Sequence, residues 1–230
     1  GLSHVGFGAM AIAAAMNAAP LTIAIPVVIV AAILLLRISG NAKIKGDAAI
    51  ALISTTSLAV GVMVISLTTG MNTDVYNYMF GSILAMSAED VKLSLVLSVF
   101  VLILFIVFYH KIFAITFDET FARATGVKAG VYNTLIAVLT AVTIVLGMRM
   151  MGALLISSLI IFPALTSMRV CRTFKSVIIN AAVISVVCLI AGVTLSYVAA
   201  TPAGASVVLA NLVMMVLYTV VGVVKSYAID

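Results

Sequence analysis

Few residues of this sequence have side chains suited to chemistry, and the two histidines come first. His4 stands in an apolar, glycine-rich segment, where an imidazole is costly unless it is paired or functional. Imidazole is also a common ligand of divalent transition metals. His4 is therefore a candidate metal ligand, with a packing histidine that donates to a neighbouring carbonyl as the alternative. His110 stands beside Lys111 at the end of an apolar run and is interpreted as an ordinary interfacial residue.

Other patterns that hold metals or phosphates are missing from the sequence. Cys171 and Cys188 have no CxxC partner, which predicts neither a disulfide framework nor a thiolate site. There is no GxxxxGK[ST] phosphate loop, no HExxH pair and no GxSxG elbow. The methionines around Met148 are interpreted as apolar packing. Two distant histidines cannot supply the three clustered ligands of a metalloenzyme. We therefore expect no enzymatic activity and no cofactor bound by this chain.

The longest polar connection, Thr116–Val127, reads TFDETFARATGV. Asp118 and Glu119 are suited to the start of a helix, and Arg123 follows Glu119 by four residues, the spacing of an ion pair on one helix face. Gly126 is the usual type of residue at which a helix ends. The residues alone predict a short amphipathic helix that ends at Gly126, with a merely solvated connector as the alternative.

The elements that position these residues belong to a membrane protein. Hydrophobic residues make up 65% of the 230 positions and charged residues 8%, against about 25% charged residues in soluble domains. Most apolar runs are long enough to cross a bilayer core as helices, whereas β-barrel strands would be shorter and alternate in polarity. We predict an all-α, polytopic transmembrane helical bundle of about seven full spans plus a partial first span, in a single domain over 1–230. The runs are 5–19 (partial), 21–36, 48–67, 91–109, 131–147, 151–168, 176–199 and 205–224.

The basic residues predict how the bundle is oriented. Ten of the twelve lysines and arginines fall in alternate connections, which are therefore expected to face the cytoplasm, and only Lys92 and Arg149 fall outside. The segment 75–86, within the 68–90 connection, is apolar but short, which favours an interfacial or re-entrant helix on the outer side. The sequence has no stripe of basic residues, so no nucleic-acid partner is expected. The cytoplasmic set comprises 37–47, 110–130, 168–175 and the tail from Lys225.

Five motifs follow one another along the chain: Leu2-Ser3-His4, GDAAIALISTTSLAVGVMVIS from Gly46, YMFGSILAMSAEDV from Tyr78, FDETFARATGV from Phe117 and RMMGALLISSLIIFPALTS from Arg149. In this order they resemble the permeases of zinc/manganese/iron ABC importers. The FGSILAxSxED and DxxxARAxGV patterns are fairly specific together, and the resemblance runs from residue 2 to about Gly204. Because residue 1 falls inside an apolar segment, the chain is expected to be truncated at its start.

The resemblance implies a multi-pass permease in a bacterial or archaeal plasma (inner) membrane. Members of this family form dimers of permease subunits in the lipid bilayer and receive zinc, manganese or iron from an extracytoplasmic metal-binding protein. Two separate cytoplasmic ATPase subunits bind ATP and power the import. The resemblance does not choose among the three metals.

The resemblance also implies which residues carry the function. His4 would be a pathway ligand or gate for the metal. The family commonly shows an aspartate three residues before the serine of the LSH motif, which would lie upstream of Gly1, so we expect an incomplete metal site here. The coupling segment, at about 116–128, would dock in a groove of the ATPase. Its residues are Phe117, Asp118, Glu119, Ala122, Arg123 and Gly126.

Two other kinds of transporter remain as alternatives. A permease for a metal chelate would require a wider pathway and generally more spans. An ion-coupled secondary transporter would need carboxylates within the membrane or ion sites at broken helices. No Asp or Glu falls inside a predicted span, which favours the ATP-driven importer.

Overall fold

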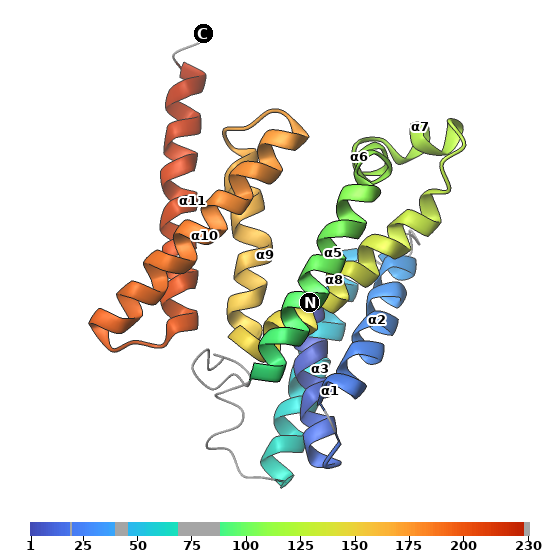
Figure 1. The fold of residues 1–230 in the computed structure, drawn as a ribbon, viewed down its shortest axis with the longest axis vertical. Helices are drawn as coiled ribbons and strands as arrows, with labels where there is room; N and C mark the ends of the chain where they lie inside the picture. The colour runs from blue at the N-terminus through green and yellow to red at the C-terminus, as the bar shows by residue number, and fades with distance from the viewer. Residues whose placement is uncertain (19, 40–45, 69–87, 228–230) are drawn as a thin grey trace.

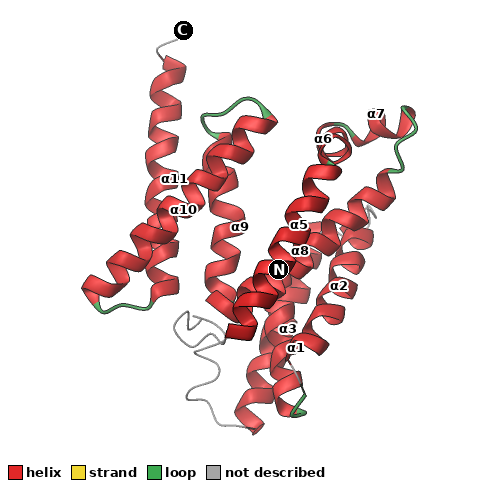
Figure 2. Ribbon diagram, in the orientation of Figure 1, coloured by secondary structure: helices red, strands yellow, loops and turns green. Residues whose placement is uncertain are grey.

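The structure is a computed structural model that describes residues 1–18, 20–39, 46–68 and 88–227, in which all regular secondary structure is helical (Figures 1 and 2). The prediction of an all-α fold is confirmed. The helices are α1 Leu2–Ala15, α2 Pro20–Ser39, α3 Gly46–Thr68, α5 Ala88–Val107, α6 Tyr109–Phe117, α7 Glu119–Ala124, α8 Ala129–Met151, α9 Ala153–Met168, α10 Phe174–Ala199 and α11 Ala203–Tyr227.

Each predicted apolar run coincides with one of these helices, but they differ in length. Within the described ranges, five helices are long and apolar enough to cross a membrane: α2, α3, α8, α10 and α11. A sixth span results if α5 and α6, which meet at a bend of 68°, are counted together. Helix α9, with 16 residues, and α1, with 14, are shorter. The chain is therefore a multi-pass membrane protein, and α9 accounts for the difference from the seven full spans predicted.

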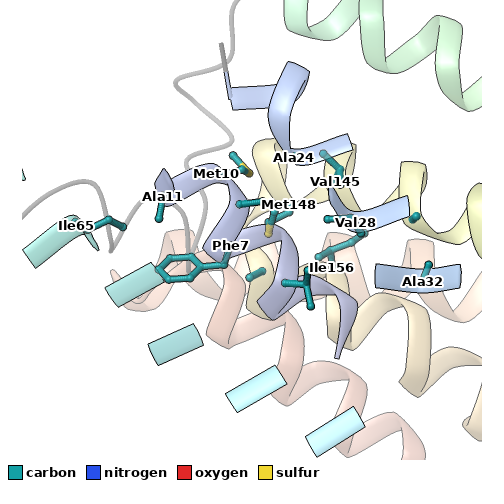
Figure 3. Close-up of a cluster of buried hydrophobic side chains, with 14 residues drawn as sticks. Phe7, Met10, Ala11, Ala24, Val28, Ala32, Ile65, Val145, Met148 and Ile156 are labelled. Carbon is teal, nitrogen blue, oxygen red and sulfur yellow. The ribbon is translucent and has the colours of Figure 1, made fainter. Parts of the chain in front are cut away.

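Helix α1 lies at the centre of the largest buried cluster. Phe7 and Met10 of α1 belong to a core that also contains Val28 of α2, Val145 and Met148 of α8 and Ile156 of α9 (Figure 3). Helix α1 approaches α3 so closely that position 8 requires glycine, because a Cβ at Gly8 would lie 2.7 Å from the carbonyl oxygen of Ser57 in α3. Such small residues let membrane helices pack backbone to backbone. The burial of Met148 confirms its interpretation as packing.

The three C-terminal helices, α9 to α11, pack extensively on one another. A Cβ at Gly192 of α10 would lie 2.4 Å from the Cα of Val207 in α11, which shows how closely these helices approach. Near the other end of α11, a Cβ at Gly222 would lie 3.1 Å from the carbonyl oxygen of Arg169, which follows α9. Helix α9 also contacts α8 and α1 and so joins these helices to the rest of the bundle.

The direction of the helices agrees with the predicted grouping of the connections. In Figure 1, the α6–α7 arm, the α9–α10 connection and the C-terminal end of α11 lie toward the upper end. The α1–α2, α8–α9 and α10–α11 connections lie toward the lower end. Three of the predicted basic stretches therefore share one end, which we name the basic end. Residues 40–45 and the predicted helix 75–86 lie outside the described residues.

Candidate functional site

The start of α7 is fixed by the residue that precedes it. Asp118 has extended backbone angles, with φ −150° and ψ 95°, between the end of α6 and the first turn of α7. Its Oδ1 accepts a hydrogen bond from the backbone N–H of Phe121 at 2.9 Å. Aspartate at this position satisfies an N–H that the helix itself leaves unpaired. The predicted role of Asp118 in starting a helix is confirmed.

One ion pair lies along α7. The Arg123 Nε donates to the Glu119 Oε1 at 3.1 Å, one turn apart on the helix. Hydrogen bonding from Arg123, assisted by Asn133 of α8, lowers the pKa of Glu119 below its ordinary value. Both side chains are well exposed, so the pair contributes little to stability. It instead keeps a carboxylate and a guanidinium side by side at the surface.

The end of α7 is a Schellman motif at Gly126. The Val127 N–H donates to the Ala122 carbonyl at 3.0 Å, and the Gly126 N–H donates to the Arg123 carbonyl at 3.0 Å. Gly126 has a φ of +85°, which glycine adopts without strain. The predicted helix end is confirmed. Helix α7 has only six residues, and these caps at both ends determine its length.

The residues predicted to couple to an ATPase differ in exposure: some are buried and others lie at the surface. Ala122 is 1% exposed and packs with Ile115 of α6 and Ala129 of α8, so it anchors α7 to its neighbours. Phe117 and Phe121 are each 65% exposed, which is unusual for large apolar side chains. Phe121 was not among the residues predicted from the sequence. Its spacing of four residues from Phe117 was the available signal.

His4 lies in a different part of the bundle, near the start of α1. Its neighbour Ser3 is buried, and the Ser3 Oγ lies 2.6 Å from the Ser157 Oγ of α9. Gly1 and Gly8, which share a side of the chain with His4 at helical spacing, both lie against α3. The His4 imidazole is half-buried and makes no hydrogen bond to another described residue. It is available to a ligand.

The described residues do not assemble a complete metal site. Among them, no group of three or more His, Cys, Asp and Glu side chains lies close enough to hold an ion. His110 belongs to α6, where its ring lies 5.5 Å from that of Tyr109. Cys171 and Cys188 are free thiols. Asp47, in the first turn of α3, is exposed. The structure therefore leaves His4 as a single imidazole.

Comparisons with known proteins place these features in one family. The sequence model of the ABC 3 transport family matches residues 1–222. The chain is 30% identical to the high-affinity zinc uptake system membrane protein ZnuB of Haemophilus influenzae, over 94% of this chain and 83% of that protein. It is 28% identical to the manganese transport system membrane protein MntC of Halalkalibacterium halodurans, over 90% of this chain and 71% of that protein.

A solved structure shows the same fold. The structure of PsaBC from Streptococcus pneumoniae in complex with Fab contains a chain that superposes on this one with a TM-score of 0.83. The two chains are 28% identical, and the match covers 94% of this chain and 78% of that one.

Proposed function

Since this chain belongs to the ABC 3 transport family, we propose that it is the membrane-spanning permease of an ATP-driven importer of divalent transition metals. Residues 1–230 act as one permease domain in a bacterial or archaeal plasma membrane. A second permease subunit completes the pathway, and an extracytoplasmic metal-binding protein delivers zinc, manganese or iron. Cytoplasmic ATPase subunits hydrolyse the ATP. The names of its relatives, a zinc uptake and a manganese transport protein, support this cargo.

The single observation that carries the proposal is helix α7 at the basic end of the bundle. A six-residue helix capped at both ends is short and rigid, and Ala122 anchors it to α6 and α8. Such an element can transmit the closure of an ATPase as a rigid-body movement of the spans behind it. The basic end faces the cytoplasm in this proposal, as the distribution of lysine and arginine predicts.

The residues of α7 have separate roles in docking. Phe117 and Phe121 present apolar surface to a groove of the ATPase, and Glu119 with Arg123 supplies charge at its edge. Three other residues do not need to touch the ATPase. Asp118 fixes the start of the helix, Ala122 packs it against α6 and α8, and Gly126 fixes its end.

His4 is a ligand or gate in the metal pathway. Its imidazole is half-buried beside α3 and makes no hydrogen bond to another described residue, so a passing cation can use a ring nitrogen. One imidazole does not hold a metal by itself. Further ligands are therefore required, as the resemblance to the LSH motif implies.

The proposal is tested by metal uptake into vesicles that contain the permease, its ATPase and its binding protein. We expect ATP-dependent uptake, with competition among zinc, manganese and iron identifying the cargo. Vesicles that lack the permease but contain ATPase are the control. Uptake driven by an ion gradient without the ATPase, or uptake of a metal chelate only, would contradict the proposal in favour of the corresponding alternative.

A further inference from the structure

Phe174, the first residue of α10, lies against three aromatic rings of α6. Its ring centroid is 5.2 Å from that of Phe113, 5.6 Å from that of Tyr109 and 6.1 Å from that of Phe117. The pairs with Phe113 and Phe117 are edge-on, with interplanar angles of 62° and 76°. Edge-to-face pairs at such distances attract one another beyond the apolar area they bury. One residue thus joins α10 to almost the whole length of α6.

The geometry of α6 explains why the three rings meet one partner. Tyr109, Phe113 and Phe117 are spaced by four residues and form a stripe along one side of the helix. The bend of 68° after α5 turns this helix away from the line of the span that precedes it. Phe113 and Phe117 also contact each other, with centroids 4.8 Å apart. Phe174 contacts this pair and also Tyr109, so it links all three rings.

Each side of this aromatic contact is firmly attached to a different part of the molecule. On one side, Phe117 ends α6 and only Asp118 separates it from α7. On the other, Thr173 caps α10 by accepting a hydrogen bond from the Ser176 N–H at 3.3 Å, which fixes the backbone around Phe174. Helix α10 then packs along α9 and α11. Within the described residues, no hydrogen bond or ion pair joins α6 or α7 to α10.

We infer that Phe174 is a positioning residue that transmits movement of the α6–α7 arm to the three-helix unit α9–α11. The inference rests on the proposed function, in which an ATPase moves α7. Helix α7 reaches α8 directly through Ala122 and Ala129. Helix α9 also contacts α8, but the start of α10 receives the movement of α6 through the aromatic stripe and Phe174. We therefore expect truncation of this ring to reduce transport while docking of the ATPase is unchanged.

A simpler explanation is that these rings only anchor the protein at the membrane surface, where aromatic residues are enriched. An anchoring ring would act by its own affinity for the interface. Its removal would lower the yield of inserted protein and leave the coupling of an assembled complex intact. The two explanations predict different results for the same substitution.

The test compares Phe174→Ala with wild type in the complete complex of permease, ATPase and binding protein. We expect ATPase co-purification to be unchanged and uptake per assembled complex to fall at least about fivefold, the lower end of typical couplings between sites. Phe174→Tyr, which keeps the ring, should restore uptake. Phe100→Ala on α5 is the matched control, since its exposed ring makes no contact with the stripe. Normal uptake in Phe174→Ala would overturn the inference.

A second measurement does not depend on uptake. Hydrogen exchange of the first amides of α10 is measured with and without bound ATPase. We expect ATPase binding to change their protection in wild type and in Phe100→Ala, but not in Phe174→Ala. An equal change in all three proteins would overturn the inference. A wild-type complex that assembles but takes up no metal would contradict the proposed function, and the exchange experiment would then decide the role of Phe174.

Discussion

Helix α7 begins and ends where its own residues dictate, whereas helix α1 is positioned by the helices that surround it. The first has a capping aspartate, an ion pair and a glycine with positive φ, all within nine residues of sequence. The second has no side-chain cap, and most of its residues are buried against α2, α3, α8 and α9. The short helix that we propose to dock is specified by local sequence, whereas the helix that carries His4 depends on its neighbours.

This difference predicts different consequences of mutation. Changes in α7 should alter one surface feature while the bundle remains folded. Changes on the packed sides of α1 should disturb the bundle itself, because small residues hold it against α3.

The largest effect is expected from Gly8→Ala in α1. The added Cβ would lie 2.7 Å from the Ser57 carbonyl oxygen, a backbone atom that cannot move aside alone. We expect a loss of about 1–3 kcal/mol of stability, as for other overpacked cores. Thermal unfolding of the purified protein measures it. Gly130→Ala, where no atom lies within 4 Å of the new Cβ, is the control and should change little.

A smaller effect is expected from Gly126→Ala at the end of α7. No atom crowds the new Cβ, so the cost arises from the φ of +85° alone, about 1–2 kcal/mol of local strain. The bundle should keep its thermal stability, while less ATPase co-purifies with the permease. Unchanged co-purification would show that the exit of α7 is not needed for docking.

Asp118→Ala removes the cap at the other end of α7. The loss of the hydrogen bond to the Phe121 N–H should destabilise the helix by about 0.5–2 kcal/mol. Faster hydrogen exchange within 119–124 measures this effect, and Asp118→Asn, which retains a capping oxygen, should restore most of the protection. Equal exchange in Asp118→Ala and wild type would contradict the role of the cap.

The smallest effect is expected from titration of Glu119. Because Arg123 lowers its pKa in the folded state, the ion pair stabilises the helix above the ordinary glutamate pKa of about 4.3, and this stabilisation is lost as the pH falls through the lowered value. An NMR titration of the glutamate carboxyl should therefore give a lower pKa in wild type than in Arg123→Gln. Equal values would show that the pair does not form in solution.

The sequence predicted the local features well and the tertiary ones poorly. The apolar runs located the helices because a span in lipid needs about 20 apolar residues. Asp118 and Gly126 predicted the ends of α7 because caps act on adjacent backbone. Nothing at Phe108 marked the break between α5 and α6, since neither proline nor glycine stands there. Nothing in the sequence indicated that α1 lies at the centre of the largest buried cluster.

Some residues of the candidate site could not be assigned from sequence. Phe174 gains its role only because α6 and α10 meet in space, and one more phenylalanine in an apolar sequence carries no signal. The resemblance assigned Ala122 to the proposed coupling segment, but whether its side chain faced outward or inward depended on packing against Ile115 and Ala129. Side-chain direction is a property of the assembled helices.

In our proposal, His4 and α7 serve separable steps, which are metal passage and ATPase docking. The decisive measurement is the uptake of limiting metal by His4→Ala, divided by the amount of assembled permease–ATPase complex in the same vesicles. We expect most uptake per complex to be lost while assembly persists, because α7 lies in another part of the bundle. Wild-type uptake per complex at every limiting metal concentration, with only a lower yield of complex, would identify His4 as a packing residue and contradict the claim.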